Sequence, residues 1–136
     1  MDNRLVHKHL IISSEVSNPP KDKILLKNWY IELVEKIGMT LVPSFKMDGA
    51  QNPVIYDCEE PGNEGMTISG VIETSCISVH TWDAGYPAKL ELDIYTCSCL
   101  DINLVFDHIK VFEPIRGSWL FIDREFGLKI LGTGEF

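Results

Sequence analysis

The residues best placed for chemistry lie in one stretch, residues 70–82, which reads GVIETSCISVHTW. Two short apolar runs flank a polar break there, which is typical of two strands joined by a turn. Successive side chains of a strand point to opposite faces, so Ser78, His80 and Trp82 are expected to share one face. The intervening positions are mostly apolar and take the other face. A hydroxyl and an imidazole are therefore expected on a face that is not purely core.

The motif within this stretch is Ser-Cys-Ile-Ser-Val-His-Thr-Trp at positions 75–82. It resembles the self-processing region of S-adenosylmethionine decarboxylase proenzymes, the small pyruvoyl-dependent enzymes of polyamine (spermidine) biosynthesis. The match is contiguous and specific. It continues more loosely in Leu-Asp-Ile-Tyr-Thr-Cys at positions 92–97 and in Lys-His-Leu at positions 8–10. Together with the order of predicted elements, the resemblance covers most of the chain.

The resemblance implies that the chain makes its own cofactor. The Ser75 hydroxyl would attack the carbonyl of Thr74, and the amide would become an ester. β-Elimination would then break the chain between these residues and leave a dehydroalanine that hydrolyses to a pyruvoyl group. Such a step needs a strained or polarised peptide and donors for the developing oxyanion. His80 matches the histidine that assists processing. The assisting serine of the preceding strand matches Ser69, or Thr67 by strict spacing, and strand parity does not choose between them.

The implied reaction is the decarboxylation of S-adenosylmethionine. The pyruvoyl ketone would take the substrate's amino group as a Schiff base and act as an electron sink while carbon dioxide leaves. A placed acid must then protonate the product carbon. Cys97 matches the family's proton donor, whose function requires the protonated thiol, and an apolar, acid-rich setting would favour that form. Without the rest of the motif, Cys97 would be interpreted as a small buried hydrophobic residue.

Several positions depart from the family's pattern. Thr74 stands where Glu is common, with Glu73 one place earlier, and Cys76 stands where His is common. The acidic residue that binds the ribose hydroxyls in the family falls on Ala84 by strict count, and Asp83 is the nearest carboxylate. We therefore expect Glu73 and Asp83 to be the substrate-binding carboxylates.

Composition narrows the class of protein. A chain of 136 residues predicts a single domain over residues 1–136. The formal charge of −8, without clustered Lys and Arg, argues against nucleic-acid binding. No run of about 18 apolar residues and no signal sequence is present, so we expect a cytoplasmic protein without a membrane partner. Without a secretory signal, the even count of four cysteines does not imply disulfides. Cys97-Ser98-Cys99 lacks the second nearby ligand pair that zinc sites usually need, so no metal is expected.

The apolar pattern predicts the elements that position these residues. A helix is expected over residues 23–37, with Asp22 as its cap and Gly38 as its stop, and a second helix between Asp101 and Pro114. Residues 48–65 and 124–136 are expected to form a loop and a tail. Strands are expected at residues 4–16, 39–47, 66–73, 76–82, 89–96 and 117–123.

This order of elements predicts an α+β fold, a two-layer sandwich of an antiparallel sheet with two helices packed on one face. The resemblance implies the same architecture and a homodimer with active sites near its interface. Two other functions stay open. The chain could be an unprocessed, non-catalytic homologue that binds a ligand or a partner subunit, or a pyruvoyl decarboxylase of arginine or ornithine.

Overall fold

The computed structural model describes residues 6–125 and 127–136. Strands and helices follow one another in an order that starts with a strand and ends with a hairpin. The elements are β1 (Lys8–Val16), α1 (Lys23–Lys36), η1 (Ser44–Lys46), β2 (Val54–Cys58), β3 (Gly65–Ile72), β4 (Ser75–Trp82), β5 (Ala88–Thr96), α2 (Ile102–Ile109), η2 (Lys110–Phe112), β6 (Pro114–Asp123) and β7 (Lys129–Glu135).

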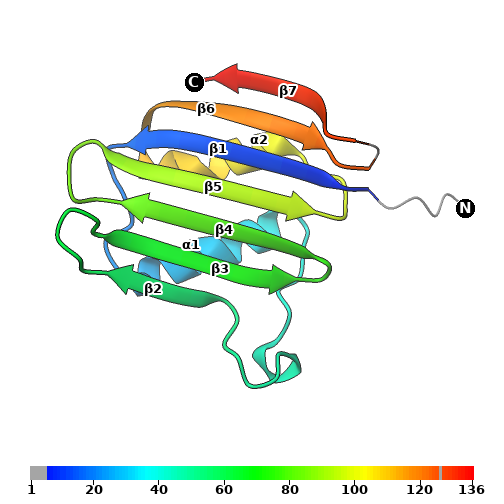
Figure 1. The fold of residues 1–136 in the computed structure, drawn as a ribbon, viewed down its shortest axis with the longest axis horizontal. Helices are drawn as coiled ribbons and strands as arrows, with labels where there is room; N and C mark the ends of the chain where they lie inside the picture. Colours follow the sequence, from blue (N-terminus) through cyan, green and yellow to red (C-terminus); the bar gives the residue numbers. More distant parts are fainter. Residues whose placement is uncertain (1–5, 126) are drawn as a thin grey trace, which may run out of the picture.

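Seven strands form one sheet in the order β2-β3-β4-β5-β1-β6-β7, and every neighbouring pair is antiparallel. Figure 1 shows both helices behind this sheet, with the other face uncovered. The helices contact each other directly, because Trp29 Nε1 donates to the His108 carbonyl at 3.0 Å and Lys36 pairs with Asp107 at 2.7 Å. The predicted α+β class is confirmed.

The core lies between the sheet and the helices. Burial alternates along the central strands, and the buried positions of β5 begin at Ala88 and recur at every second residue to Thr96. This is the pattern of a strand with one face on the core and one face open. Aliphatic side chains dominate the strand part of the core, and the fully buried ones include Leu10, Ile12, Ile68, Ile77, Leu90, Leu92 and Ile94.

Helix α1 is fixed to the hairpin of β3 and β4 by a buried tyrosine. Tyr30 Oη donates to the Ile77 carbonyl at 2.7 Å, and burial raises the pKa of its phenol above the ordinary value. Gly70 pairs with Ile77 across the hairpin, and a Cβ at Gly70 would lie 2.8 Å from the Tyr30 oxygen. The absence of a side chain at Gly70 therefore lets the phenol reach the strand.

The predicted helix caps are confirmed. Asp22 accepts a hydrogen bond from the backbone of Leu25, and Asp101 accepts one from the backbone of Asn103. Gly38 follows the end of α1 with a φ of 78°, the left-handed conformation in which glycine is favoured.

Three predicted segments are wrong. Residues 39–47 were expected to be a strand, but Leu41 makes only an isolated bridge to Ile72, and a 3-10 turn follows Pro43. The expected loop over residues 48–65 contains β2, and the expected tail over residues 124–136 contains β7. Both are edge strands with mostly exposed side chains, so they lack the apolar alternation that identifies a strand in the sequence.

Two strand boundaries differ from the prediction by three or four residues, and those of β3, β4 and β5 differ by one. The last predicted strand begins at Pro114 rather than at residue 117, because its pairing with β1 extends to Val16. The first strand begins at Lys8, and the predicted positions Arg4 and Leu5 lie outside the described residues. Within the described part of the chain, no helix is long and apolar enough to cross a membrane.

Candidate active site

The turn between β3 and β4 contains the bond at which cleavage is predicted. Ile72 pairs with Ser75, so Glu73 and Thr74 form a two-residue turn. Thr74 has a φ of 53°, in the left-handed region. A β-branched residue rarely adopts this conformation, which costs on the order of 1–3 kcal/mol. The peptide bond between Thr74 and Ser75 therefore lies in strained backbone.

The pairing of β4 with β5 brings Ser75 beside Cys97. Ser75 lies at the helix-facing side of β4 and is 7% exposed. Its Oγ accepts a hydrogen bond from the Cys97 backbone N at 3.0 Å and donates to Cys97 Sγ at 3.4 Å. Thr74 Oγ1 lies 2.7 Å from the same sulfur. Three residues predicted to take part in cleavage and catalysis thus form one contact group.

The thiol of Cys97 has an environment opposite to the expected one. The hydrogen bonds from Ser75 and, second in size, from Thr74 lower the pKa of this thiol below its ordinary value. Burial and the nearby Glu73 act in the other direction but are weaker. The pKa of the thiol is thus shifted in the direction opposite to the one that the apolar, acid-rich setting was expected to produce, because hydroxyl donors stabilise the thiolate.

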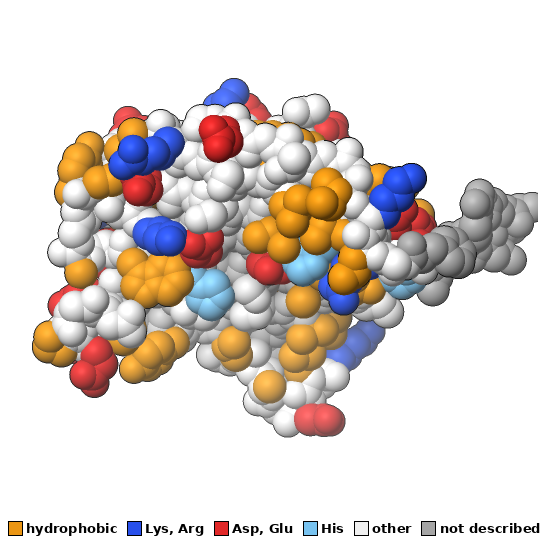
Figure 2. Space-filling view, turned by 45° about the horizontal axis from the view of Figure 1, so that its top comes forward, with side chains coloured by type: hydrophobic (Ala, Val, Ile, Leu, Met, Phe, Trp, Pro, Cys, Tyr) orange, Lys and Arg blue, Asp and Glu red, His pale blue; other side chains and the backbone are white. Residues whose placement is uncertain are grey.

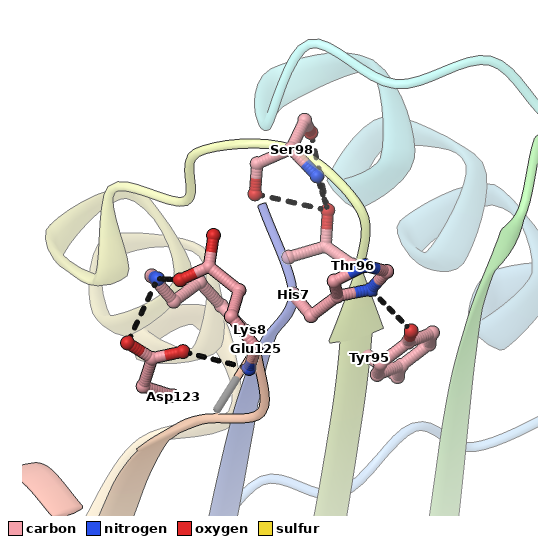
Figure 3. Close-up of polar contacts among 7 residues, drawn as sticks. All are labelled: His7, Lys8, Tyr95, Thr96, Ser98, Asp123 and Glu125. Atoms are coloured by element: carbon pink, nitrogen blue, oxygen red, sulfur yellow. Dashed lines mark hydrogen bonds and ion pairs between the residues drawn. The ribbon is translucent and has the colours of Figure 1, made fainter. Parts of the chain in front are cut away.

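Cys97 lies in a short turn after β5, between Thr96 and Ser98, and Figure 3 shows the bonds of these two neighbours. Thr96 is fully buried, and its Oγ1 accepts a hydrogen bond from the Ser98 backbone at 3.0 Å and lies 3.1 Å from Ser98 Oγ. One residue earlier, Tyr95 Oη and His7 Nδ1 are hydrogen-bonded at 2.8 Å. The bond from Ser98 to Thr96 thus closes a turn around Cys97, and the Tyr95 bond ties the preceding part of β5 to His7.

An ion-pair cluster ties β1 to the end of β6 beside that turn. Lys8 Nζ lies 2.9 Å from a Glu125 oxygen and 3.6 Å from an Asp123 oxygen (Figure 3). The Glu125 backbone N donates to Asp123 at 2.9 Å. The bond to Glu125 is the main reason that the pKa of Lys8 is raised.

The predicted residues Ser69 and His80 lie on the uncovered sheet face, where Figure 2 shows histidine and apolar side chains among charged ones. Ser69 Oγ and Ser78 Oγ are 2.9 Å apart, and Thr67 Oγ1 is 3.0 Å from His80 Nδ1. The His80 ring stacks on Trp82 with centroids 5.9 Å apart. The predicted common face of Ser78, His80 and Trp82 is confirmed by the alternating burial of β4.

One chain does not bring Ser75 together with His80 or Ser69. Ser75 lies on the helix side of β4 and His80 on the open side, five residues further along. Five residues of extended strand span about 16 Å. Ser69 pairs with Ser78, three residues beyond Ser75. The two groups of predicted residues are thus separated along the hairpin and across the sheet.

The two predicted substrate-binding carboxylates lie at opposite ends of β4. Glu73 is exposed in the turn before β4, and its backbone N donates to the Thr40 carbonyl at 3.4 Å. Asp83 is exposed just after β4, and its backbone N donates to the Glu64 carbonyl at 3.1 Å. Within one chain, therefore, they do not face the same ligand.

The structure also gathers polar residues that the sequence pattern did not single out. On the open face next to the Cys97 turn, His9 Nε2 pairs with Asp93, and Arg124 lies over the Tyr95 ring with its guanidinium carbon 4.6 Å from the ring centroid. Arg124 Nη1 is 3.4 Å from His9 Nδ1. The residues are far apart in sequence, and only the period-two pattern of residues 89–96 could have indicated the face that Asp93 and Tyr95 share.

Metal chemistry has no support among the described residues, because no three His, Cys, Asp or Glu side chains there are grouped as ligands. All four cysteines are free thiols. The groups available for chemistry at the candidate site are therefore hydroxyl, thiol, imidazole and carboxylate side chains.

These features define the class of protein as an α+β domain with a serine and a cysteine at a strained hairpin. The sequence model of the S-adenosylmethionine decarboxylase family matches residues 8–125 of the 136-residue chain, and the chain belongs to that family. Membership supports the decarboxylation of S-adenosylmethionine in polyamine biosynthesis as its general function. No curated protein shows a significant match to the chain.

Proposed function

We propose that this protein is a pyruvoyl-dependent S-adenosylmethionine decarboxylase that forms its cofactor by cleaving itself between Thr74 and Ser75. The observation that carries the proposal is the 3.4 Å contact between Ser75 Oγ and Cys97 Sγ, next to the left-handed Thr74. A nucleophilic hydroxyl, a strained peptide bond and a proton-donating thiol are the three groups that this chemistry needs at one place.

Cleavage follows from the groups in the hairpin. Ser75 Oγ attacks the Thr74 carbonyl carbon, and the C–N bond breaks as the ester forms. A proton then leaves Ser75 Cα, the Cβ–Oγ bond breaks, and Thr74 departs as a carboxylate. Water hydrolyses the remaining enamine to the ketone and releases ammonia. The left-handed φ of Thr74 raises the energy of the uncleaved turn, so this conformation favours the first step.

The residues around Ser75 fit a pyruvoyl group at that position. The ketone would be built from Ser75 atoms at the start of β4, a site that is 7% exposed and bordered by the Cys97 sulfur. When formed, the pyruvoyl group supplies an electron sink for decarboxylation. The Cys97 thiol donates a proton to the product carbon, and the turn from Thr96 to Ser98 keeps the thiol at this end of the sheet.

Two copies of the chain would complete the site. His80 and Ser69 cannot reach the hairpin of their own chain, but both lie on the uncovered sheet face. If two sheets pack with their open faces together around a two-fold axis, His80 and Ser69 of one copy can approach the turn that holds the Thr74 carbonyl in the other copy. Asp83 can likewise approach Glu73 of the second copy. The homodimer is therefore part of the proposed mechanism.

An intact-mass spectrum of the purified protein under denaturing conditions tests the proposal. Two fragments split between Thr74 and Ser75, the second beginning with a pyruvoyl group, are expected. Release of labelled carbon dioxide from S-adenosylmethionine, but not from arginine or ornithine, then identifies the substrate. A folded protein that keeps a single full-length mass and binds S-adenosylmethionine without releasing carbon dioxide would contradict the proposal and support the non-catalytic alternative.

A further inference from the structure

The Cys97 sulfur is surrounded by the hairpin that the proposed reaction breaks. Ser75 Oγ donates to the sulfur at 3.4 Å and Thr74 Oγ1 lies 2.7 Å from it. In its protonated form the sulfur can donate to the Glu73 carbonyl oxygen at 3.5 Å. Cys97 is 22 residues from Ser75 in sequence, so these contacts depend on the pairing of β4 with β5. The polar neighbours of the sulfur thus belong to the three residues at the cleavage point.

The Thr74 hydroxyl has one proton and two partners. It lies 2.7 Å from the Glu73 carbonyl oxygen and 2.7 Å from the Cys97 sulfur. When the sulfur is a thiolate, the hydroxyl donates to it, because a charged acceptor forms the stronger hydrogen bond. The lowered pKa of Cys97 agrees with this arrangement. The Glu that the family commonly carries at this position has no hydroxyl, so the contact is particular to Thr74.

We propose that Thr74 is a positioning residue that, together with the Ser75 hydroxyl, holds the Cys97 sulfur as a hydrogen-bond acceptor in the uncleaved chain, and that cleavage releases this sulfur to become a proton donor. The first part concerns the intact chain alone. The second part rests on the proposed function, because it needs the bond between Thr74 and Ser75 to be cut.

Cleavage removes both hydroxyl contacts for chemical reasons. The Ser75 oxygen leaves with Thr74 when the Cβ–Oγ bond breaks, so the donor at position 75 is lost. Thr74 becomes a chain end and is no longer held at a φ of 53° by a two-residue turn. Its new carboxylate is an anion next to the sulfur, which disfavours a thiolate. In the uncleaved chain, therefore, the Ser75 and Thr74 hydroxyls occupy the Cys97 sulfur, and maturation frees it from both contacts.

Other titratable groups near the sulfur do not change on cleavage. Glu73 lies on the same turn and acts on the Cys97 pKa in the upward direction. The Cys76 thiol and the phenol of Tyr95 face each other across β4 and β5, and His7 is bonded to that phenol. These groups are present in both states, so a difference between the cleaved chain and the uncleaved Ser75→Ala chain reports on the Thr74 contact and the new carboxylate.

The test measures the rate of Cys97 alkylation by iodoacetamide as a function of pH, with the modified residue located by peptide mass spectrometry. A Cys99→Ser background keeps the neighbouring exposed thiol out of the same peptide. Ser75→Ala removes the nucleophile and keeps every chain intact. On this background, Thr74→Val and Thr74→Ala are expected to move the midpoint of the profile to higher pH and to slow alkylation severalfold at neutral pH. Thr74→Ser, which retains the hydroxyl, is expected to keep the midpoint.

An unchanged midpoint in both Thr74→Val and Thr74→Ala overturns the positioning role, and the use of two variants guards against one that fails to fold. For the release step, the protein without substitutions at positions 74 and 75 is measured after cleavage. It is compared with the uncleaved Ser75→Ala protein. The midpoint of the cleaved protein is expected at higher pH, and an equal or lower midpoint overturns the release. If the unaltered chain stays full-length, the proposed function and the release step fail together, whereas the Ser75→Ala series still decides the role of Thr74.

Discussion

The hydroxyl of Ser75 and the sulfur of Cys97 lie 3.4 Å apart although 22 positions separate them in the chain. The contact forms because β4 begins at Ser75 and β5 ends at Thr96, so the start of one strand meets the end of its antiparallel neighbour. It places the predicted source of the cofactor beside the predicted proton donor. His80 and Ser69 lie too far from this contact to act on it within one chain.

Co-expression of two inactive variants is expected to restore cleavage. His80→Ala removes the assisting imidazole but keeps Ser75, and Ser75→Ala keeps His80 but has no nucleophile. If His80 acts on a second copy, a mixed dimer of the two variants cleaves its His80→Ala chain, whereas each variant alone stays intact. Intact-mass spectrometry of differently tagged chains measures this. Absence of cleavage in purified mixed dimers would show that His80 does not act across an interface.

Cys97→Ala is expected to separate cleavage from turnover. The thiol is assigned to protonation of the product carbon, so the chain should still split at Ser75 while kcat falls by roughly 100-fold or more, as for loss of a general acid. Carbon dioxide release and intact mass are measured on the same sample. Cys58→Ala, at a thiol on the far edge strand β2, is the matched control and should leave both unchanged.

Ser69→Ala is expected to slow self-cleavage by roughly 100-fold or more, the range for loss of one oxyanion-stabilising donor. Ser69 lies on the open face and is hydrogen-bonded to Ser78. Ser13→Ala is the control, because Ser13 lies on the same face but is bonded to Glu91. The half-time of full-length chain after synthesis, followed by electrophoresis, gives the rates. Equal half-times for Ser69→Ala and Ser13→Ala would remove Ser69 from the mechanism.

Thr74→Gly is expected to stabilise the uncleaved protein and to slow its cleavage. Glycine adopts a φ of 53° without the clash that threonine has, so the free energy of unfolding in a Ser75→Ala background should rise by about 0.5 to 1 kcal/mol. Urea denaturation measures the change. Glu73→Gly is the control, because Glu73 does not have a positive φ and gains nothing from glycine. A loss of stability in Thr74→Gly would mean that the turn is not strained.

Tyr30→Phe is expected to lower the free energy of unfolding by about 1 to 2 kcal/mol, because the Ile77 carbonyl loses its buried donor. The control is Tyr86→Phe, since Tyr86 is 78% exposed and its hydroxyl should contribute nothing measurable. Urea denaturation of both variants in the Ser75→Ala background measures their free energies of unfolding. Equal stabilities would show that the bond from α1 to the hairpin adds no net stability.

The sequence by itself determined the central part of the fold. Helix caps at Asp22 and Asp101, the strands around residues 66–96 and the face shared by Ser78 and His80 follow from local pattern, because capping groups and alternation act within a few residues. The motif at positions 75–82 also indicated the family that the match over residues 8–125 identifies. Signals of this kind need no knowledge of distant contacts.

Only the tertiary structure decided the edge strands and the division of the site. Strands β2 and β7 are held by hydrogen bonds to β3 and β6, and their exposed side chains leave no periodic signal. The left-handed φ of Thr74 and its contact with Cys97 arise from the way two hairpins meet, which no local pattern encodes. The separation of Ser75 from His80 has the same origin, since strand pleat and rise place them on opposite faces about 16 Å apart.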